Sequence, residues 1–427
     1  MKRQPLEPAL EEIERRHLRR RRATVESYPE PGDHTQVIVD GRRLVDFSSN
    51  DYLGLAAHPV LAAAMAECAM SCGAGSGASH LISGHGREHA ALEEELAAFT
   101  GRPRALLFST GYMANLGVVT ALAERGESVL LDRLSHASLI DAGLLSGARF
   151  RRYPHCDAVA ARRLLAESTP QTTVLATDGV FSMDGDIAPL AALAEAAREH
   201  AAWLVVDDAH GIGVLGAHGG GALEVAGLGC EQVPVLVGTL GKALGSFGAF
   251  VAGSGDLIEL LIQRARSYTY TTALPQPVAA ATRAALRLSR EESWRRERVL
   301  ALTARFRAAA RQSGVPLADS VTPIQPIPLG SAQAALAAQH ALREAGFWVI
   351  AIRSPTVPAG AERLRITLTA GHQESQIDAL VESLSRACAS ARASAPVSPA
   401  PAPAPVPVPT STSEAVLAPT PAPDPTP

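Results

Sequence analysis

The sequence predicts an α/β protein, with a mostly parallel central sheet in a large domain and a smaller C-terminal α+β domain. Short apolar runs alternate with Ala- and Leu-rich amphipathic segments, the pattern of βαβ units around a parallel sheet. Over residues 280–312 the pattern becomes almost continuously helical and separates the two parts. The chain has 427 residues, and roughly 150 residues per domain allows two to three domains.

The elements of the first part follow in chain order. The first fifty residues predict a basic helix, a turn over 29–32 and a hairpin through Asp40-Gly41. Strands are expected over 105–108, 128–131, 173–176, 203–207, 235–237 and 248–252. Helices are expected between them, for example over 89–99 and over 189–200, where a glycine and a proline mark one end of each.

The second part repeats the alternation on a smaller scale. Strands are expected over 324–329, 348–353 and 363–368, and helices over 332–345 and 376–389. From residue 391 the composition changes to Pro, Ala, Ser, Thr and Val, which bury too little surface to fold. We therefore divide the chain into an N-terminal arm (1–55), a large domain (56–285), a small domain (286–390) and a disordered tail (391–427).

Charge and cysteine content exclude several classes of protein. Thirty-nine basic and 43 acidic side chains give a net charge of −4, so nucleic acid is not an expected partner. The least polar stretch, 235–253, is rich in glycine and contains Lys242, so no membrane span is expected. The N-terminus lacks an apolar signal segment, and the five cysteines include no CxxC pair. We expect a cytoplasmic protein without a metal site.

A lysine between glycines is the strongest chemical signal. Lys242 follows a predicted strand in Val237-Gly-Thr-Leu-Gly-Lys-Ala-Leu-Gly245. Partial burial lowers the pKa of a lysine and makes its amine nucleophilic toward a carbonyl carbon, as a Schiff-base lysine requires. A loop lysine that points into water is the alternative. The spacing is not that of a Walker loop, so ATP is not expected.

Two carboxylates and a histidine follow another predicted strand, in Trp203-Leu-Val-Val-Asp-Asp-Ala-His-Gly211. Ligands of open α/β sheets bind beyond the carboxyl ends of the strands, so we expect Asp207 and His210 at the site, with Asp207 paired to a buried cation. Two alternatives stay open. Asp207, Asp208 and His210 form a set of metal ligands, or they serve as helix caps and core residues.

A third segment, Phe108-Ser-Thr-Gly-Tyr-Met-Ala-Asn115, turns from a predicted strand directly into a helix. Backbone N–H groups at a helix N-terminus suit a phosphate dianion. An ordinary helix cap is the alternative. A phosphate near Gly111, a positive ring nitrogen at Asp207 and an aldehyde carbon at Lys242 together describe pyridoxal phosphate.

The same segments resemble the α-oxoamine synthases, which have the aspartate-aminotransferase fold (PLP-dependent transferase fold type I). The resemblance runs from about residue 16 to 389 and includes 47–55, 75–78, 132–138, 179–185, 207–211, 239–242 and 353–360. It implies this fold, pyridoxal 5'-phosphate as the cofactor, and a homodimer in which residues 268–272 complete the neighbouring active site.

The resemblance also implies a role for each matching residue. Lys242, Asp207 and His136 are the implied catalytic residues, at the aldehyde carbon, the ring nitrogen and the ring face of the cofactor. The other implied cofactor ligands are Gly111, Tyr112 and Thr239 at the phosphate, and Ser182 and His210 near the ring hydroxyl. The implied substrate ligands are Asn50, Arg365, His136, Thr356, and Arg20 or Arg21 from the run 19–22. Asp178 stands where the family more often has glutamate.

Within the family, the segments 355–360 and 363–370 favour a member of biotin synthesis, a PLP-dependent acyltransferase. The implied reaction condenses L-alanine with pimeloyl-CoA or pimeloyl-carrier protein and releases carbon dioxide, with the Lys242 amine removing the Cα proton. Two alternatives stay open. One is a sibling synthase such as glycine C-acetyltransferase or 5-aminolevulinate synthase, and the other is a non-catalytic binding protein on the same fold.

Overall fold

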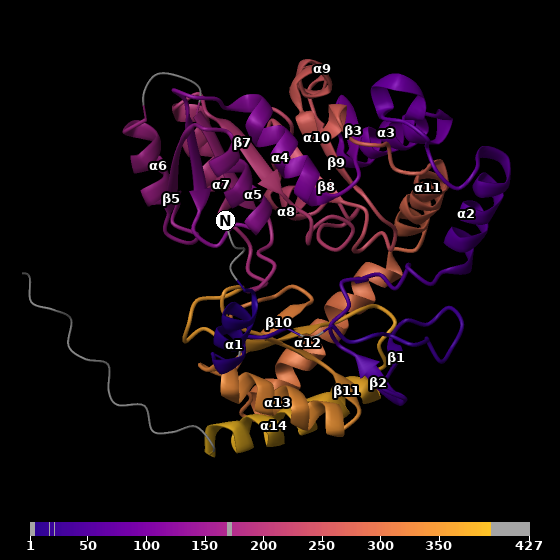
Figure 1. Cartoon of the computed structure of the whole chain (residues 1–427), viewed down its shortest axis with the longest axis vertical. Coiled ribbons are helices and arrows are strands. Elements are labelled where there is room, and N and C mark those ends of the chain that lie inside the picture. Colours follow the sequence, from indigo (N-terminus) through magenta and orange to yellow (C-terminus); the bar gives the residue numbers. More distant parts are fainter. Residues whose placement is uncertain (1–4, 17, 21, 169–172, 394–427) are drawn as a thin grey trace, which may run out of the picture. The chain divides into compact units, whose positions relative to one another are not determined.

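A seven-stranded sheet is the largest element of the structure, a computed structural model that describes residues 5–16, 18–20, 22–168 and 173–393 (Figure 1). The strand order is β3 (Arg104–Phe108), β9 (Ala249–Gly253), β8 (Val235–Thr239), β7 (Trp203–Asp207), β6 (Thr173–Asp178), β4 (Ser128–Asp132) and β5 (Arg149–Tyr153). Strand β9 runs antiparallel to both of its neighbours, β3 and β8, and the other six strands all run in one direction. The prediction of an α/β fold with a mostly parallel sheet is confirmed.

Helices cover both faces of this sheet. Alternate strand residues enter two separate cores, with Leu106 and Phe108 on one face and Ala105 and Leu107 on the other. The first core contains residues of α4 (Gly111–Leu122), α5 (Ala137–Leu145), α9 (Gly255–Arg264) and α10 (Arg266–Thr269). The second contains residues of α3 (Arg87–Thr100), α6 (Ala158–Ala166), α7 (Leu190–Glu199), α8 (Ala222–Ala226) and α11 (Gln276–Glu291). Burial on both faces explains the continuous apolar runs of the central strands.

The edge strand β5 was not predicted. Its sequence, Arg-Phe-Arg-Arg-Tyr, has no apolar run, and its residues other than Tyr153 are partly or fully exposed. Charged residues on an edge strand discourage pairing with another sheet. The pairing of β5 with β4 is therefore a tertiary feature that local composition hides.

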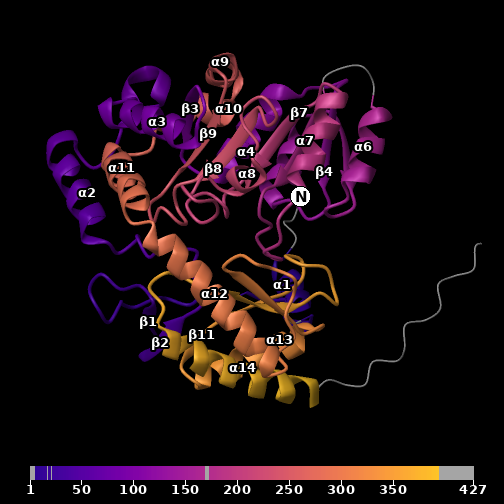
Figure 2. The ribbon, with the colours of Figure 1, turned by 180° about the vertical axis from the view of Figure 1, so that it is seen from behind.

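A second, antiparallel sheet forms the core of the C-terminal part. Its order is β10 (Ile324–Pro328), β13 (Arg363–Thr367) and β12 (Ile350–Ile352). It packs with α12 (Trp294–Gln312), α13 (Ala332–Glu344) and α14 (Glu374–Ala393). Figure 2 shows α12 running from the large-sheet part to the small-sheet part. The predicted smaller α+β part is confirmed.

The N-terminal hairpin belongs to a third sheet. Strands β1 (Gln36–Val39) and β2 (Arg42–Asp46) are joined by Asp40 and Gly41, whose φ angles of 49° and 68° are left-handed, as expected for this turn. Strand β11 (Phe347–Trp348) pairs in parallel with β2. The single strand expected over 348–353 is therefore wrong, because β11 and β12 lie in different sheets.

Three helical elements and the chain end complete the fold. Helices α1 (Glu7–Arg15) and α2 (Pro59–Cys72) precede the large sheet, and a π-helix, η1 (His80–Gly84), precedes α3. Helix α14 continues into the first three residues of the predicted tail, and the tail from 394 onward lies outside the described residues. The other domain boundaries stay predictions. Among the described residues, no helix is both long and apolar enough to cross a membrane.

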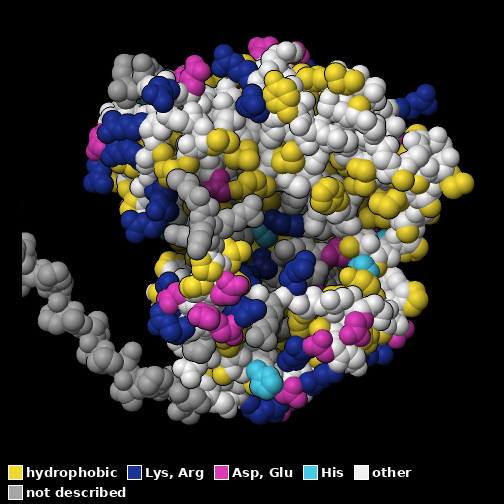
Figure 3. Space-filling view, in the orientation of Figure 1, with side chains coloured by type: hydrophobic (Ala, Val, Ile, Leu, Met, Phe, Trp, Pro, Cys, Tyr) yellow, Lys and Arg dark blue, Asp and Glu magenta, His cyan; other side chains and the backbone are white. Residues whose placement is uncertain are grey.

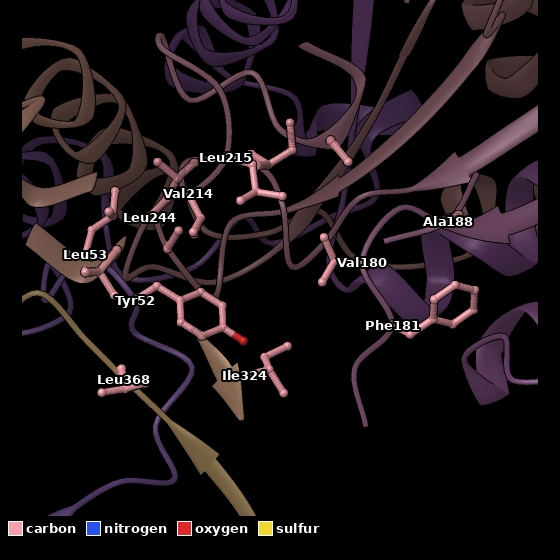
Figure 4. Packing of buried hydrophobic residues seen from close by; sticks show 14 of the residues in the cluster. Tyr52, Leu53, Val180, Phe181, Ala188, Val214, Leu215, Leu244, Ile324 and Leu368 are labelled. Carbon is pink, nitrogen blue, oxygen red and sulfur yellow. The ribbon is translucent and has the colours of Figure 1, made fainter. Parts of the chain in front are cut away.

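One continuous core connects the large-sheet part with the small-sheet part. Tyr52, at 1% exposure, lies at its centre and follows the N-terminal hairpin in sequence. Figure 4 shows residues of this core from both parts around it: Leu53, Val180, Leu215, Ile324 and Leu368. This packing holds loops from both sheets beside the carboxyl ends of the large-sheet strands.

Candidate active site

The carboxyl ends of β6, β7 and β8 meet beside a cavity of about 210 Å³. The ladder aligns Asp178 with Asp207, and Asp207 with Val237, so the three strands end together. The cavity is lined by Gly111, Tyr112, His136, Ser138, Asp178, Asp207, Ala209, His210, Thr239 and Lys242. Seven of the predicted site residues therefore lie around one space. A larger cavity of about 720 Å³ lies between α2, α3 and α11 and contains none of them.

Lys242 points its amine into the cavity rather than into water. Its Nζ lies 2.8 Å from His210 Nε2. Burial lowers the pKa of Lys242 to about 8, and the opposing attraction of Asp207 is smaller. Burial and the neighbouring cation Lys242 also hold the pKa of His210 well below its usual range, so this imidazole is neutral.

A chain of hydrogen bonds leads from Lys242 toward the small sheet. The Lys242 ammonium donates to His210 Nε2, which leaves the proton on Nδ1 to donate to the Tyr52 hydroxyl at 2.8 Å. The Tyr52 hydroxyl then donates to Asn50 Oδ1 at 3.2 Å. Both terminal nitrogens of Arg365 donate to the same oxygen at 3.2 Å. Side chains from four segments distant in sequence are thus joined.

Asp207 is held by groups that the sequence analysis did not assign. Its Oδ2 accepts from Asn115 Nδ2 at 2.6 Å, and its Oδ1 accepts from the Ala209 N–H at 3.1 Å. Asn115 Nδ2 also donates to Ser138 Oγ, which lies 2.7 Å from His136 Nδ1. A buried asparagine in the otherwise apolar start of α4 was the available signal for this network.

Asp178 lies beside Asp207 at the end of the neighbouring strand. Burial and then the charge of Asp207 raise the pKa of Asp178 well above its usual range. Its Oδ2 accepts from the His136 N–H at 3.0 Å. The raised pKa favours a protonated Asp178 beside Asp207.

The part of the cavity wall formed by Gly111, Tyr112 and Thr239 has the features of a phosphate site. Helix α4 begins at Gly111, and Thr110 Oγ1 accepts from the Met113 N–H at 3.2 Å. Thr239 reaches the same space from the end of β8 and donates to the Gly248 carbonyl at 3.1 Å. The Tyr112 hydroxyl donates to Asp141. A helix N-terminus facing the cavity favours an anion.

These features together fit pyridoxal phosphate. The cavity wall offers an anion site at one end, an amine with a lowered pKa, and a carboxylate at a strand end. The alternative metal site is not assembled. The Asp208 carboxylate accepts from the Ala222 N–H at 2.7 Å instead, and both ring nitrogens of His210 have partners.

The remaining predicted residues lie outside the cavity wall. Arg365, at 7% exposure, donates from Nε to the Ser182 carbonyl at 2.7 Å, so Ser182 contacts it through its backbone. Arg20 donates to Thr356 Oγ1 at 2.8 Å, and both residues are exposed. Arg21 lies outside the described residues.

Comparison with known proteins places this site in a family. The sequence family described as aminotransferase class I and II matches residues 42–384. The chain belongs to the class I and II aminotransferase family. The matching region includes the cavity-lining residues of all three strand ends, and the predicted pyridoxal phosphate dependence is confirmed.

Within the class I and II aminotransferase family, the chain is most similar to a smaller group of synthases among the relatives compared. The 8-amino-7-oxononanoate synthase of Methylococcus capsulatus is 62% identical over 89% of this chain and 97% of its own. That of Stutzerimonas stutzeri is 58% identical over 87% and 94%. Among solved structures, serine palmitoyltransferase K265A from S. paucimobilis, with a bound PLP–myriocin adduct, has a TM-score of 0.86. It is 28% identical and covers 92% of this chain and 100% of its own. The predicted resemblance to the α-oxoamine synthases is confirmed.

Proposed function

We propose that this chain condenses L-alanine with a pimeloyl thioester, with loss of carbon dioxide, to form 8-amino-7-oxononanoate in biotin synthesis. The observation that carries the proposal is Lys242, whose amine lies in a cavity shared with Asp207 and the N-terminus of α4. Relatives at 62% and 58% identity are named for this reaction. They favour it over the sibling synthases and over a non-catalytic binding protein.

The cofactor supplies an electron sink that stabilises negative charge at the alanine Cα. Lys242 would hold its aldehyde carbon, Asp207 its ring nitrogen and His136 its ring face. Its phosphate would lie at Gly111, Tyr112 and Thr239, and its ring hydroxyl near Ser182 and His210. The assignments of Lys242, Asp207, His136, Gly111, Tyr112, Thr239 and His210 rest on their position around the cavity and on the family resemblance, whereas that of Ser182, outside the cavity wall, rests on the resemblance alone.

Lys242 also acts as the base. With a pKa of about 8, roughly a tenth of the amine is neutral at pH 7, far more than for a lysine with the ordinary value. The neutral amine takes the Cα proton and returns a proton to the product. His210, 2.8 Å away, fixes the position of the amine when no substrate is attached.

Arginines of the N-terminal arm and of the C-terminal part would bind the anionic ends of the substrates. Arg365 and Asn50 form a pair suited to the alanine carboxylate. Arg20 and Thr356 form a second pair, and Arg20 or Arg21 would contact the acyl carboxylate. Figure 3 shows basic side chains inside the hollow between the two parts, a surface that favours an anionic thioester.

We further propose a cytoplasmic homodimer. The segment 268–272 would complete the partner's active site, and Tyr270 in it is 73% exposed. Leu81 and Ile82, from η1 near this segment, are also exposed apolar residues. Burial of such side chains in a subunit contact is favourable.

The test is a panel of acyl donors with purified enzyme. Pimeloyl-CoA and pimeloyl-carrier protein are each offered with alanine or glycine, beside acetyl-CoA and succinyl-CoA. We expect carbon dioxide and the free thiol only with alanine and a pimeloyl donor. Turnover of glycine with acetyl-CoA or succinyl-CoA at a higher kcat/KM would assign the chain to a sibling activity instead.

A further inference from the structure

Three histidines form a compact cluster outside the cofactor cavity. His80 lies in η1, His85 follows it, and His89 lies in the first turn of α3. Their ring centroids are separated by 5.2 Å (His80–His85), 5.2 Å (His80–His89) and 5.6 Å (His85–His89). One ligand nitrogen from each ring lies within 4.8 Å of the other two. The sequence analysis expected no metal site because of the cysteine spacing, but that spacing gives no information about a site made of histidines.

These separations match those of a tetrahedral histidine site. With zinc–nitrogen bonds of about 2.0–2.1 Å, two ligand nitrogens lie roughly 3.4 Å apart and their ring centres roughly 5 Å apart. His80 Nδ1 and His85 Nδ1 are 3.0 Å apart, so both face the same point. To bind one metal ion, these two nitrogens must move apart by only a few tenths of an ångström.

The rings are oriented by the surrounding protein, as metal-ligating histidines are. His89 is fully buried and donates from Nε2 to the Leu274 carbonyl at 2.6 Å, which leaves Nδ1 as its lone-pair nitrogen. His80 is buried and stacks on Tyr268, with centroids 4.9 Å apart. His85 is exposed, which gives an ion a path from solvent.

The neutral form of each ring favours metal binding, because only a neutral imidazole has a lone pair to donate. Burial lowers the pKa of all three histidines, that of His80 to about 3. A carboxylate is also close. Glu93 Oε2 lies 4.0 Å from His85 Nε2, near enough to accept a hydrogen bond from this ring after a small shift.

We propose that His80, His85 and His89 bind one divalent transition-metal ion, of the zinc, cobalt or nickel class, with water as the fourth ligand. The site has a structural role. It joins η1 to α3, and through the His80–Tyr268 stack it holds α10 beside β3, where Tyr268 meets Phe108.

Hydrogen bonds within the cluster compete with the ion. The Gly86 N–H donates to His89 Nδ1 at 2.9 Å, and one of the two facing Nδ1 atoms of His80 and His85 donates to the other. Metal binding replaces both bonds. We therefore expect an affinity weaker than that of a site built from cysteine thiolates.

The experiment is calorimetric titration of ZnCl₂ into untagged, chelator-treated holoenzyme, together with visible absorption after addition of CoCl₂. We expect one ion per chain, tetrahedral Co²⁺ absorption bands and a higher melting temperature with Zn²⁺. His85→Ala, at an exposed position, and His80→Gln should each weaken Zn²⁺ binding by more than the roughly 10- to 100-fold that loss of an outer-shell partner costs.

The exposed histidine of α13 is the matched control. His340→Ala should leave Zn²⁺ affinity unchanged. Absence of Zn²⁺ binding by the wild-type chain, or binding that His85→Ala and His80→Gln do not weaken, would overturn the proposal. Circular dichroism of each variant separates lost ligation from lost folding.

Discussion

The proposed mechanism gives the amine of Lys242 two functions that no neighbouring side chain can supply together. In that mechanism it is the nucleophile for the cofactor aldehyde and the base for the Cα proton, and burial lowers its pKa to about 8. His210 is near enough to hydrogen-bond it, but its neutral imidazole forms no stable covalent link to an aldehyde. The chemistry therefore depends on this one side chain.

Lys242→Ala is expected to abolish synthase turnover while the fold is retained. Among the described residues, the Lys242 side chain makes no hydrogen bond to the backbone, and the cavity can accept water in its place. The measurements are thiol release from pimeloyl-CoA and far-UV circular dichroism. Turnover above the level of an enzyme-free control, in protein free of wild-type enzyme, would contradict the assignment.

Asp207→Asn is expected to slow exchange of the alanine Cα proton strongly while cofactor binding is retained. The substitution preserves shape but removes the charge that should hold the ring nitrogen protonated. Loss of a buried charge partner costs about 3–5 kcal/mol, which corresponds to roughly a hundred- to several-thousand-fold in rate. Proton exchange followed by NMR in heavy water measures the effect.

Asp208→Asn is the matched control for this prediction. Burial raises the pKa of Asp208 to about 8, so its carboxyl group is largely protonated near neutral pH and resembles an amide. It also faces the Ala222 N–H rather than the cavity. Its exchange rate should stay near that of the wild type. If Cα proton exchange were slow in Asp208→Asn and normal in Asp207→Asn, Asp208 rather than Asp207 would be the partner of the ring nitrogen.

At the scale of single residues, the sequence predicted those parts of the site that topology brings together. Asp207, Thr239 and Lys242 follow buried apolar strands, and parallel strands place such residues at one edge. Arg365 was expected only from the family resemblance, because its strand belongs to another sheet. The Asn115–Ser138 link was missed, because the asparagine in the apolar start of α4 signals a buried polar contact but the sequence does not show which side chain it contacts.

At the scale of elements, burial on both faces decided which strands were predictable. The central strands β4, β6 and β7 are fully or almost fully buried and read as apolar runs. Strand β5 was missed because its edge position tolerates arginine, and β11 because two residues carry no period. A strand can be predicted from the sequence when its own residues are apolar and buried. It cannot be predicted when only its pairing with a neighbouring strand defines it.

The end of α14 separates a removable tail from a required helix. Truncation after Ala393 should leave melting temperature and activity nearly unchanged, because the removed segment is Pro- and Ala-rich, a composition that we expect to bury little surface. Truncation after Ser383 should destabilise the protein by several kcal/mol. It removes the buried Leu384, Ala387, Cys388 and Ala391, and loss of one buried leucine alone costs about 2–5 kcal/mol.

Thermal unfolding of the two truncated chains tests this boundary. If the chain truncated after Ala393 melts several degrees below the full chain, the tail packs on the folded chain. The sequence analysis placed the start of the tail at residue 391. A truncation there would remove Ala391, which is 3% exposed and belongs to the core.

At the scale of the whole molecule, His372 joins the N-terminal hairpin to the C-terminal part. Its ring is fully buried and stacks on Phe47, with centroids 4.1 Å apart. Nε2 donates to the Asp46 carbonyl at 3.0 Å, and Nδ1 accepts from the Thr369 N–H at 3.0 Å. Only the neutral ring can accept the Thr369 N–H, so protonation breaks that bond, and burial lowers the pKa of His372 to about 4.

This arrangement predicts a loss of stability in mild acid. The unfolded histidine takes up a proton below its ordinary pKa of 6.5, whereas the folded one stays neutral until about pH 4. The unfolded state therefore binds more protons in this window, so the free energy of unfolding falls as the pH falls from about 6.5 to 4. Between pH 7 and pH 5 the contribution of this one group is about 2 kcal/mol.

Denaturant unfolding of wild type and His372→Gln at pH 7 and pH 5 isolates that contribution. The variant should be less stable at pH 7, because it loses the stack on Phe47, but its stability should fall less on acidification. Other titrating groups, such as Asp46 with its pKa raised to about 6 by burial, contribute in both proteins and cancel in the comparison. His340→Gln, at an exposed position, should keep the pH dependence of the wild type. An equal loss in wild type and His372→Gln would mean that the ring is protonated in the folded protein, and the hydrogen bond from the Thr369 N–H would then have to be absent in solution.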